Sequence, residues 1–278
     1  MAKLSFSSWF AHYPARLLGG LGLSLACWGW GELGSIAAAH VVKIQDSGDI
    51  LLTYDPPAIA EHQAIYESLA SNGFFDALVD ELNTDLAFPQ DIQITFTECG
   101  EVNAFYYPDY VEVTMCYELL EQFIYIFGVE DGTDGFDDAV IDASLFTFFH
   151  ELGHALVHQY ELPITGREED AVDDFAAVML IDIYGDEAGL LSGMWQFESE
   201  AIEEQENLAD LPYWGEHSLS TQRFYNTACL IYGSEPNTYE FLIEEGALPE
   251  DRAERCPAEY EQKSRAWFTL LERFWQGE

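Results

Sequence analysis

The most informative chemical pattern in the sequence is His150-Glu151-Leu152-Gly153-His154. Residues four apart lie one above the other on the same face of an α-helix. On a helix, His150 and His154 can therefore offer ring nitrogens to one metal ion at about 2.0–2.1 Å. Glu151 lies one step around the helix, where it can take a proton from a metal-bound water without being a ligand. The spacing predicts a zinc site with a hydrolytic base.

A site of this kind needs a third protein ligand, and a glutamate on a following helix can supply it. Glu169 and Asp173 lie four apart, just after a glycine break at Gly166. In this arrangement Glu169 binds the ion, while Asp173 accepts the N–H of a ligand histidine and fixes its tautomer. Asp170 offers the same arrangement rotated by one residue and remains an alternative ligand. His158 is too far along the helix to share an ion with His150, because about 12 Å of helix separates the two residues.

The composition is that of a folded and very acidic protein. The chain has 278 residues, of which 49% are hydrophobic and 15% aromatic, and this excludes a disordered tail. It carries 10 Lys and Arg against 51 Asp and Glu, a formal net charge of −41. Such a charge disfavours binding to nucleic acid or to an anionic membrane surface. It also favours the hypothesis of adaptation to high salt, where screening suppresses self-repulsion.

The N-terminal segment predicts export. A positively charged start precedes the apolar run 17–30, and three alanines, Ala37–Ala39, precede His40. This order is typical of a secretory signal peptide, which we assign to residues 1–39. An uncleaved membrane anchor over the same segment is the alternative. We expect the mature chain, residues 40–278, to be a single periplasmic or extracellular domain without stable membrane insertion.

The cysteines are consistent with an oxidising compartment. Cys99, Cys116, Cys229 and Cys256 remain after signal cleavage, an even number. We predict the disulfides Cys99–Cys116 and Cys229–Cys256, because each pair flanks a short segment whose ends can meet. A zinc cluster of four cysteines is the alternative, and it fits poorly with the wide spacings and with export.

Strands are predicted early in the chain and helices late, which indicates the α+β class. Residues 91–98 alternate polar and apolar side chains as a half-buried strand does, and a turn at Pro108-Asp109 joins two further strands. The predicted strands are 40–44, 50–54, 91–98, 102–107 and 110–116. The predicted helices are 58–70, 74–86, 117–127, 137–160, 167–184, 217–232 and 258–275.

These motifs resemble the gluzincin-type zinc peptidases, whose third ligand is a glutamate in an E-x-x-x-D helix. Asn103-Ala104-Phe105-Tyr106 is similar to the segment that such enzymes carry on the edge strand over the active-site cleft. The resemblance implies a zincin-like fold, with a small N-terminal mixed sheet, an active-site helix and a mostly helical C-terminal part. It also implies that Asn103 and Ala104 bind an extended peptide substrate.

A closer resemblance is to a family of exported bacterial metallopeptidases, over about residues 95–260. The segments that carry it are VNAFYYP, CYEL, FFHELGHALVH, LPITGREEDAVDDFA and QRFYNTACLIYGSEP. Gluzincins place a His or Tyr from a later helix near the developing oxyanion. The resemblance therefore implies this catalytic role for His217, with Arg223 and Tyr225 as alternatives. Arg223 is also a candidate for substrate binding.

The resulting hypothesis is zinc-dependent hydrolysis of peptide bonds. His150, His154 and Glu169 hold Zn²⁺, and Glu151 takes the proton of the attacking water and passes it to the leaving amine. The rival hypothesis is an exported, zinc-stabilised binding protein without turnover. In that protein all four metal positions would be filled by side chains, with Asp170 or His158 as further ligands.

Overall fold

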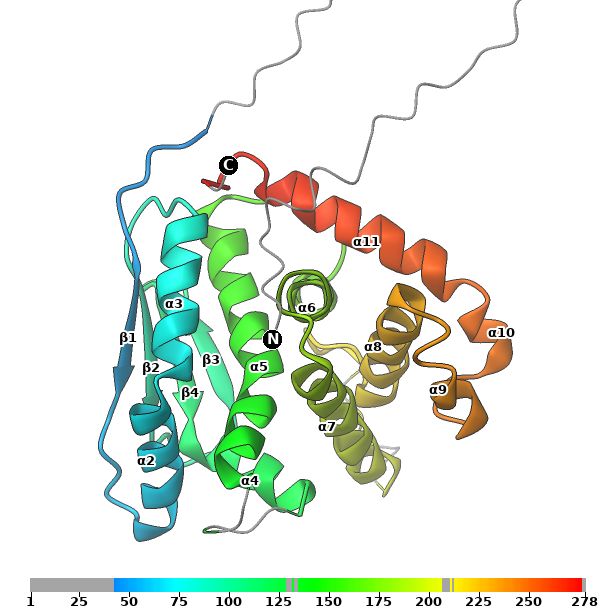
Figure 1. Ribbon diagram of the computed structural model, residues 1–278, viewed down its shortest axis with the longest axis horizontal. Coiled ribbons are helices and arrows are strands. Elements are labelled where there is room, and N and C mark those ends of the chain that lie inside the picture. The colour runs from blue at the N-terminus through cyan, green and yellow to red at the C-terminus, as the bar shows by residue number, and fades with distance from the viewer. Residues whose placement is uncertain (1–42, 129–131, 133–134, 207–210, 212, 277–278) are drawn as a thin grey trace, which may run out of the picture.

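The computed structural model describes residues 43–276, apart from 129–131, 133–134, 207–210 and 212. A small sheet lies beside a larger helical part, and helix α5 runs between them (Figure 1). The fold is therefore α+β, as the sequence predicts. The signal peptide predicted for residues 1–39 lies outside the described residues.

The sheet has four strands in the order β1-β2-β4-β3. Strand β2 pairs parallel to β1 and β4, whereas β3 pairs antiparallel to β4. Strand β3 therefore forms one edge of a mixed sheet, and the other edge of β3 has no strand beside it among the described residues. The strands are β1 (Ile50–Tyr54), β2 (Ile92–Thr97), β3 (Ala104–Tyr107) and β4 (Glu112–Cys116).

One face of the sheet is buried under helices. In β2, Ile92, Ile94 and Phe96 are fully buried and alternate with partly exposed residues, the period of two expected of a strand with one covered face. Helices α2 (Gln63–Asn72) and α3 (Phe74–Asp85) lie against this face together with α5 (Figure 1).

Helix α5 is buried on almost every side, because the sheet packs on one flank and further helices pack on the other. Its apolar residues occur around the whole helix, as expected of a central helix. The remaining helical elements are η1 (Ala60–His62), α4 (Tyr117–Ile126), α5 (Phe136–Gln159), α6 (Glu168–Val178), the π-helix η2 (Met179–Tyr184), α7 (Glu187–Glu206), α8 (Ser220–Ser234), α9 (Phe241–Glu244), α10 (Glu250–Ala253) and α11 (Cys256–Leu271).

The sequence misses helix α7, because its glycines resemble helix breakers. In the structure Gly193 serves close packing instead: a Cβ there would lie 2.3 Å from Cγ of Phe146 on α5. Several other predictions are wrong at their ends. Helix α8 begins at Ser220 rather than at residue 217, and helix α11 ends at Leu271 rather than at residue 275. Lys43 and Ile44, in the described part of the first predicted strand, are not in a strand.

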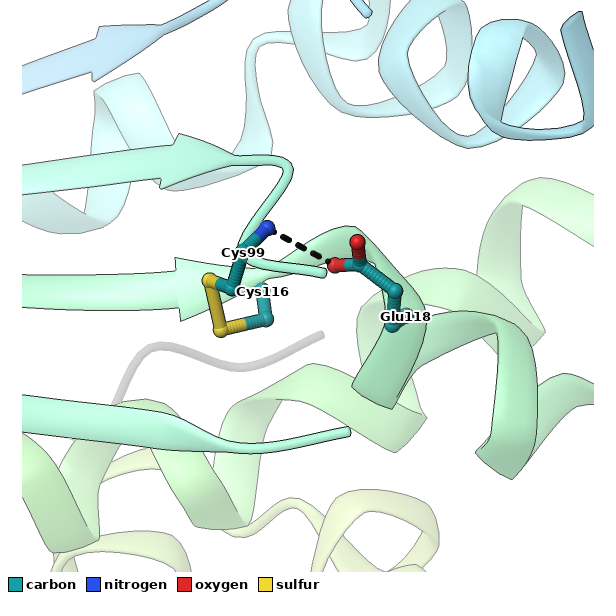
Figure 2. Close-up of side chains that lie close together, drawn as sticks. All are labelled: Cys99, Cys116 and Glu118. Atoms are coloured by element: carbon teal, nitrogen blue, oxygen red, sulfur yellow. Dashed lines mark hydrogen bonds between the residues drawn. A yellow bond between two sulfur atoms is a disulfide. The ribbon is translucent and has the colours of Figure 1, made fainter. Parts of the chain in front are cut away.

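The four cysteines lie at disulfide distance in the two pairs predicted from the sequence. Cys99–Cys116 has an S–S distance of 1.96 Å and joins the ends of β2 and β4, and Cys229–Cys256, at 2.04 Å, joins α8 to α11. Figure 2 shows the first pair with Glu118, whose carboxylate accepts a hydrogen bond from the Cys99 backbone N–H at 3.0 Å. Because both sulfurs are in the disulfide, this group is a structural link rather than a metal site. Among the described residues, no helix has the length and apolar character needed to span a bilayer.

Candidate metal centre and cleft

Helix α5 presents the two histidines of the motif on one face. The rings of His150 and His154 are 5.0 Å apart between centroids, as expected for residues one turn apart. His150 is 6% exposed and Glu151 7%, so both lie in a protected environment. Helix α5 therefore supplies two aligned imidazoles and a buried carboxyl group.

Gly153 allows helix α6 to approach this face closely. A Cβ at Gly153 would lie 2.9 Å from Cβ of Val172 and 3.0 Å from a ring carbon of Phe175. The first distance is shorter than real Cβ atoms show and the second is tighter than most, so the contact between α5 and α6 depends on the missing side chain. This contact brings the first turn of α6, which carries Glu169, to the two histidines.

Three imidazole nitrogens converge on one carboxylate oxygen, Oε2 of Glu169. The distance from this oxygen to Nε2 is 3.2 Å for His150, 3.3 Å for His154 and 2.9 Å for His217. His150, Glu169 and His217 also form a group whose ligand atoms all lie within 4.8 Å of one another. His217 comes from the loop before α8, and its side chain is 56% exposed.

The opposite nitrogen of each motif histidine contacts a carboxylate. Nδ1 of His150 lies 2.7 Å from Oδ1 of Asp173, and Nδ1 of His154 lies 2.8 Å from Oε1 of Glu168. Such contacts fix the ring orientation and direct Nε2 toward a shared point. The predicted contact of Asp173 with a motif histidine is present, whereas the sequence did not single out Glu168.

Asp173 is in turn held by Arg223. Its two oxygens accept hydrogen bonds from Nε and Nη2 of Arg223, both at 2.7 Å, and the guanidinium lies 4.0 Å from the ring centre of Phe197. This buried pair is bidentate, the strongest geometry for an Arg–carboxylate contact. Arg223 thus pairs with a buried carboxylate, and the substrate contact expected from the sequence stays a prediction.

The alternative metal ligands Asp170 and His158, and Tyr225 as the alternative to His217, make contacts away from Glu169. Asp170 lines a separate cavity, between α6 and α11, and the neighbouring Asp174 accepts a hydrogen bond from Lys263 at 2.5 Å. His158 places Nδ1 2.7 Å from the Tyr106 hydroxyl. Tyr225 packs edge-on against Phe224.

The loop that carries His217 is fastened to the start of α6 by Arg167. Its Nη1 donates to the carbonyl oxygens of Gly215, Glu216 and His217, at 3.1, 3.3 and 2.8 Å. Arg167 immediately precedes α6, two residues before Glu169. Sequence analysis did not identify this role, although an arginine at a helix start in a chain with few basic residues was an available signal.

Burial and pairing shift the acid–base properties of the cluster. Burial raises the pKa of Glu151. Burial also opposes charge on Glu169, yet its contacts with three imidazoles hold its pKa well below the usual range. For His150, burial opposes the charged form, but hydrogen bonds to Asp173 and Glu169 outweigh it and raise the pKa to about 9.

The donor set fits a zinc ion. Imidazole nitrogen and carboxylate oxygen are ligands that zinc takes, and a tetrahedral ion with bonds of about 2.0–2.1 Å holds its ligand atoms about 3.3 Å apart. The observed separations of 3.2 and 3.3 Å between Glu169 and the motif histidines have this value. Two sets of side chains are therefore placed to hold one ion around Glu169: the motif histidines His150 and His154, and the pair His150 and His217, whose ligand atoms lie within 4.8 Å of one another and of Glu169.

Two adjoining cavities open onto the cluster, with volumes of about 470 and 780 Å³. Asn103 and Ala104 line both, and so do His150, Glu151 and His217. Strand β3 therefore borders the cleft, and Ala104 at its start and Asn103 just before it face the same space as the histidines. Arg223 lines the smaller cavity and His154 the larger.

An α+β fold with this histidine and glutamate cluster beside an edge strand defines the architecture of a metallopeptidase. The chain belongs to the family described as "Putative metallopeptidase", whose model matches residues 54–271. The matched range contains every residue of the cluster. No curated protein and no solved structure matches the chain.

Proposed function

We propose that the protein is a zinc-dependent peptidase that acts outside the cytoplasm. The observation that carries the proposal is the convergence of three imidazole nitrogens on Oε2 of Glu169, beside the buried carboxyl group of Glu151. Membership of the metallopeptidase family supports a peptide as substrate. The two disulfides support export.

His150, His154 and Glu169 are the proposed ligands. A zinc ion held by them would lower the pKa of a coordinated water and polarise a substrate carbonyl oxygen. Asp173 and Glu168 hold the Nδ1 sides of the two imidazoles, so that both Nε2 atoms face Glu169. Arg223 keeps the Asp173 carboxylate charged and in place.

Glu151 is the proposed proton carrier. It lines both cavities next to the metal ligands, and its carboxyl group is largely shielded from solvent. Burial raises its pKa, and a carboxyl group with a pKa closer to neutrality is better suited to accept a proton from water and to release it to a leaving amine. In the same proposal, the exposed ring of His217 donates a hydrogen bond to the developing oxyanion.

Strand β3 is the proposed substrate guide. Among the described residues it pairs with a strand, β4, on one side only, so backbone groups on its other side are available to an extended peptide. Asn103, just before the strand, is exposed, and Ala104 has a small side chain that leaves room for a backbone to approach.

One observation favours a second candidate, a zinc-stabilised binding protein without turnover. Nε2 of His217 lies as close to Glu169 as the motif histidines do, so His217 is placed to serve as a fourth protein ligand. A metal with four protein ligands has no position left for water. Zinc removal separates the candidates, because a structural site unfolds on chelation whereas a catalytic site loses activity and stays largely folded.

The decisive experiment combines metal analysis with a peptide digest. Full-length protein, produced in a host that exports it, is assayed for bound metal and incubated with a broad peptide library, with and without chelator. We expect about one zinc per chain and cleavage that chelator abolishes and zinc restores. A zinc-loaded protein that cleaves no peptide, and that melts at a much lower temperature after chelation, would favour the binding protein.

A further inference from the structure

The smaller cavity beside Glu151 contains polar groups that the proposed mechanism does not use. Its volume is about 470 Å³, and it is bounded by α4, α5, α7 and the residues before β3. Its apolar wall comes mainly from α4 and α5, and its polar groups come from α4, α5, α7, α8 and the segments before β3 and α8. The side chains relevant here are Leu119, Phe123, Phe146, Thr147, Gln196 and Glu200.

Glu200 brings a negative charge into this cavity. Its carboxylate accepts hydrogen bonds from the Gln196 side-chain amide at 3.2 Å and from the Ser220 hydroxyl at 3.1 Å. Both donors are neutral, and no ion pair within 4.0 Å involves Glu200 in the part of the chain that the structure describes. The carboxylate therefore has no close cationic partner.

The one arginine on the cavity wall does not fill that role. The Nε and Nη2 atoms of Arg223 donate to Asp173, which is buried behind it and balances its charge. The guanidinium also lies over the Phe197 ring. Arg223 also attracts the Glu200 carboxylate electrostatically. No ion pair within 4.0 Å joins the two among the described residues, so a cation that enters the cavity can approach Glu200 without displacing a salt bridge.

An unpartnered hydroxyl group on the same wall points independently to a ligand. Thr147 is 7% exposed, and its Oγ1 is buried and has no hydrogen-bond partner among the residues that the structure describes. A threonine inside a helix commonly bonds the carbonyl four residues earlier, and a buried polar atom without any partner is costly. Thr147 lines the cavity one turn before Glu151, so a polar group of a bound substrate can supply the missing partner.

We propose that this cavity binds the arginine side chain of a substrate residue next to the bond cleaved, and that Glu200 determines this specificity. The apolar wall would pack against the methylene stem, while Glu200, the amide oxygen of Gln196 and the Thr147 hydroxyl would accept hydrogen bonds from the guanidinium. Arginine suits this set better than lysine, because its planar group carries five donors. The cleavage part of the proposal rests on the proposed function; the binding part does not.

Binding of matched peptides tests the cavity without turnover. Blocked alanine-based hexapeptides carrying one arginine or one citrulline, which has a similar shape but no charge, are titrated calorimetrically into zinc-loaded protein. We expect the arginine peptide to bind about tenfold more tightly or better, the range of a charge-assisted hydrogen bond. Equal affinity for the two peptides would overturn the proposal, whether or not the protein cleaves either of them.

Two variants test whether the preference for the arginine peptide arises in this cavity. Glu200→Gln should reduce the arginine-to-citrulline affinity ratio to near one, and Thr147→Val should reduce it by a smaller factor. Glu254→Gln, which removes the same charge from an exposed position outside the cavity, is the matched control and should keep the wild-type ratio. A ratio that falls equally in Glu200→Gln and Glu254→Gln would assign the preference to net charge and reject the role of Glu200.

If the protein hydrolyses peptides, the cleavage sites give a second readout. We expect bonds beside arginine to dominate the digest and Glu200→Gln to redistribute cleavage toward other sites. A digest without this preference counts against the cavity but leaves peptidase activity intact. Absence of all cleavage counts against the proposed function, and the calorimetric comparison still decides the specificity.

Discussion

Nη1 of Arg167 donates a hydrogen bond to the backbone carbonyl oxygen of His217 at 2.8 Å, and it contacts the two preceding carbonyls as well. The same loop places Nε2 of His217 2.9 Å from Glu169, two residues after Arg167. The start of α6 therefore carries a proposed metal ligand, Glu169, and also anchors the loop that carries the proposed catalytic histidine, His217. Arg167 is therefore a positioning residue for His217, at the rim of the larger cavity.

Replacement of Arg167 should disturb His217 without removing the metal. We expect Arg167→Met to retain zinc and to lower kcat/KM by about 10- to 100-fold, because a misplaced catalytic group costs about that much. Arg167→Lys should recover part of the loss, since an ammonium can still donate to the carbonyls. Zinc stoichiometry, peptide hydrolysis and the NMR shifts of the His217 ring check the result. Loss of zinc in Arg167→Met would show that the arginine supports the ligands themselves.

Gly153 should be needed for metal binding although it carries no ligand. In Gly153→Ala the new Cβ would collide with Val172, so α6 must move away and take Glu169 with it. We expect zinc affinity to fall by about tenfold or more. Gly166→Ala is the matched control, because its Cβ would meet no atom within 4 Å. Equal zinc affinities in a competition titration of the two variants would contradict this role for the helix contact.

Replacement of Glu151 should abolish most of the hydrolysis while leaving metal binding intact. Glu151→Gln keeps the size of the side chain but can no longer accept a proton, so we expect full zinc content and activity reduced by roughly 10²–10⁴. Metal analysis and hydrolysis of a peptide found in the library digest provide the two measurements. Unchanged hydrolysis by this variant would remove Glu151 from the mechanism.

The parts of the site that follow from spacing along one helix could be predicted from the sequence. His150, Glu151 and His154 lie together because helical geometry is local, and Glu169 was found from a second local pattern. Contacts between distant segments were harder to predict. Arg167 acts through three backbone carbonyls, a partner type that no side-chain pattern reveals.

The prediction of the fold likewise succeeded for local patterns and failed for contacts between distant segments. The period of two identified β2, and the turn at Pro108-Asp109 identified the β3–β4 pair. Helix α7 was missed because Gly193 serves a contact with Phe146 on another helix, and the sequence alone does not contain that information. For the same reason Glu200, on α7, was not recognised as a cavity residue.

Asp142 provides a pH-dependent test of folding that is remote from the metal ligands. Burial, together with repulsion from Asp186 and Asp138, raises its pKa to about 6 in the folded protein. Its contribution to stability is therefore complete below about pH 4 and is lost as the pH rises through 6. Because the side chain is partly solvated, we expect Asp142→Asn to stabilise the protein at pH 7 by only about 1 kcal/mol.

Denaturant unfolding of both proteins at pH 4 and pH 7 measures this difference. The gain from Asp142→Asn should fall to a small part of its pH 7 value at pH 4, where the carboxyl group is almost fully protonated in the folded protein and about half protonated in the unfolded chain. Asp251→Asn, at an exposed position on α10, serves as a control and should show no comparable dependence on pH. A gain of equal size at both pH values would assign the effect to packing rather than to charge.

Salt should stabilise the whole molecule because of its charge. With a formal net charge of −41, the folded chain concentrates carboxylates on a limited surface, and their repulsion is weaker in the expanded unfolded state. Raising the ionic strength from about 0.01 M to 1 M shortens the screening length from about 30 Å to 3 Å. We therefore expect the melting temperature to rise steeply over the first few tenths molar of sodium chloride. Potassium chloride should have the same effect if screening is the cause. A melting temperature that stays constant in both salts would show that surface repulsion does not limit stability, and would remove the physical basis for adaptation to high salt.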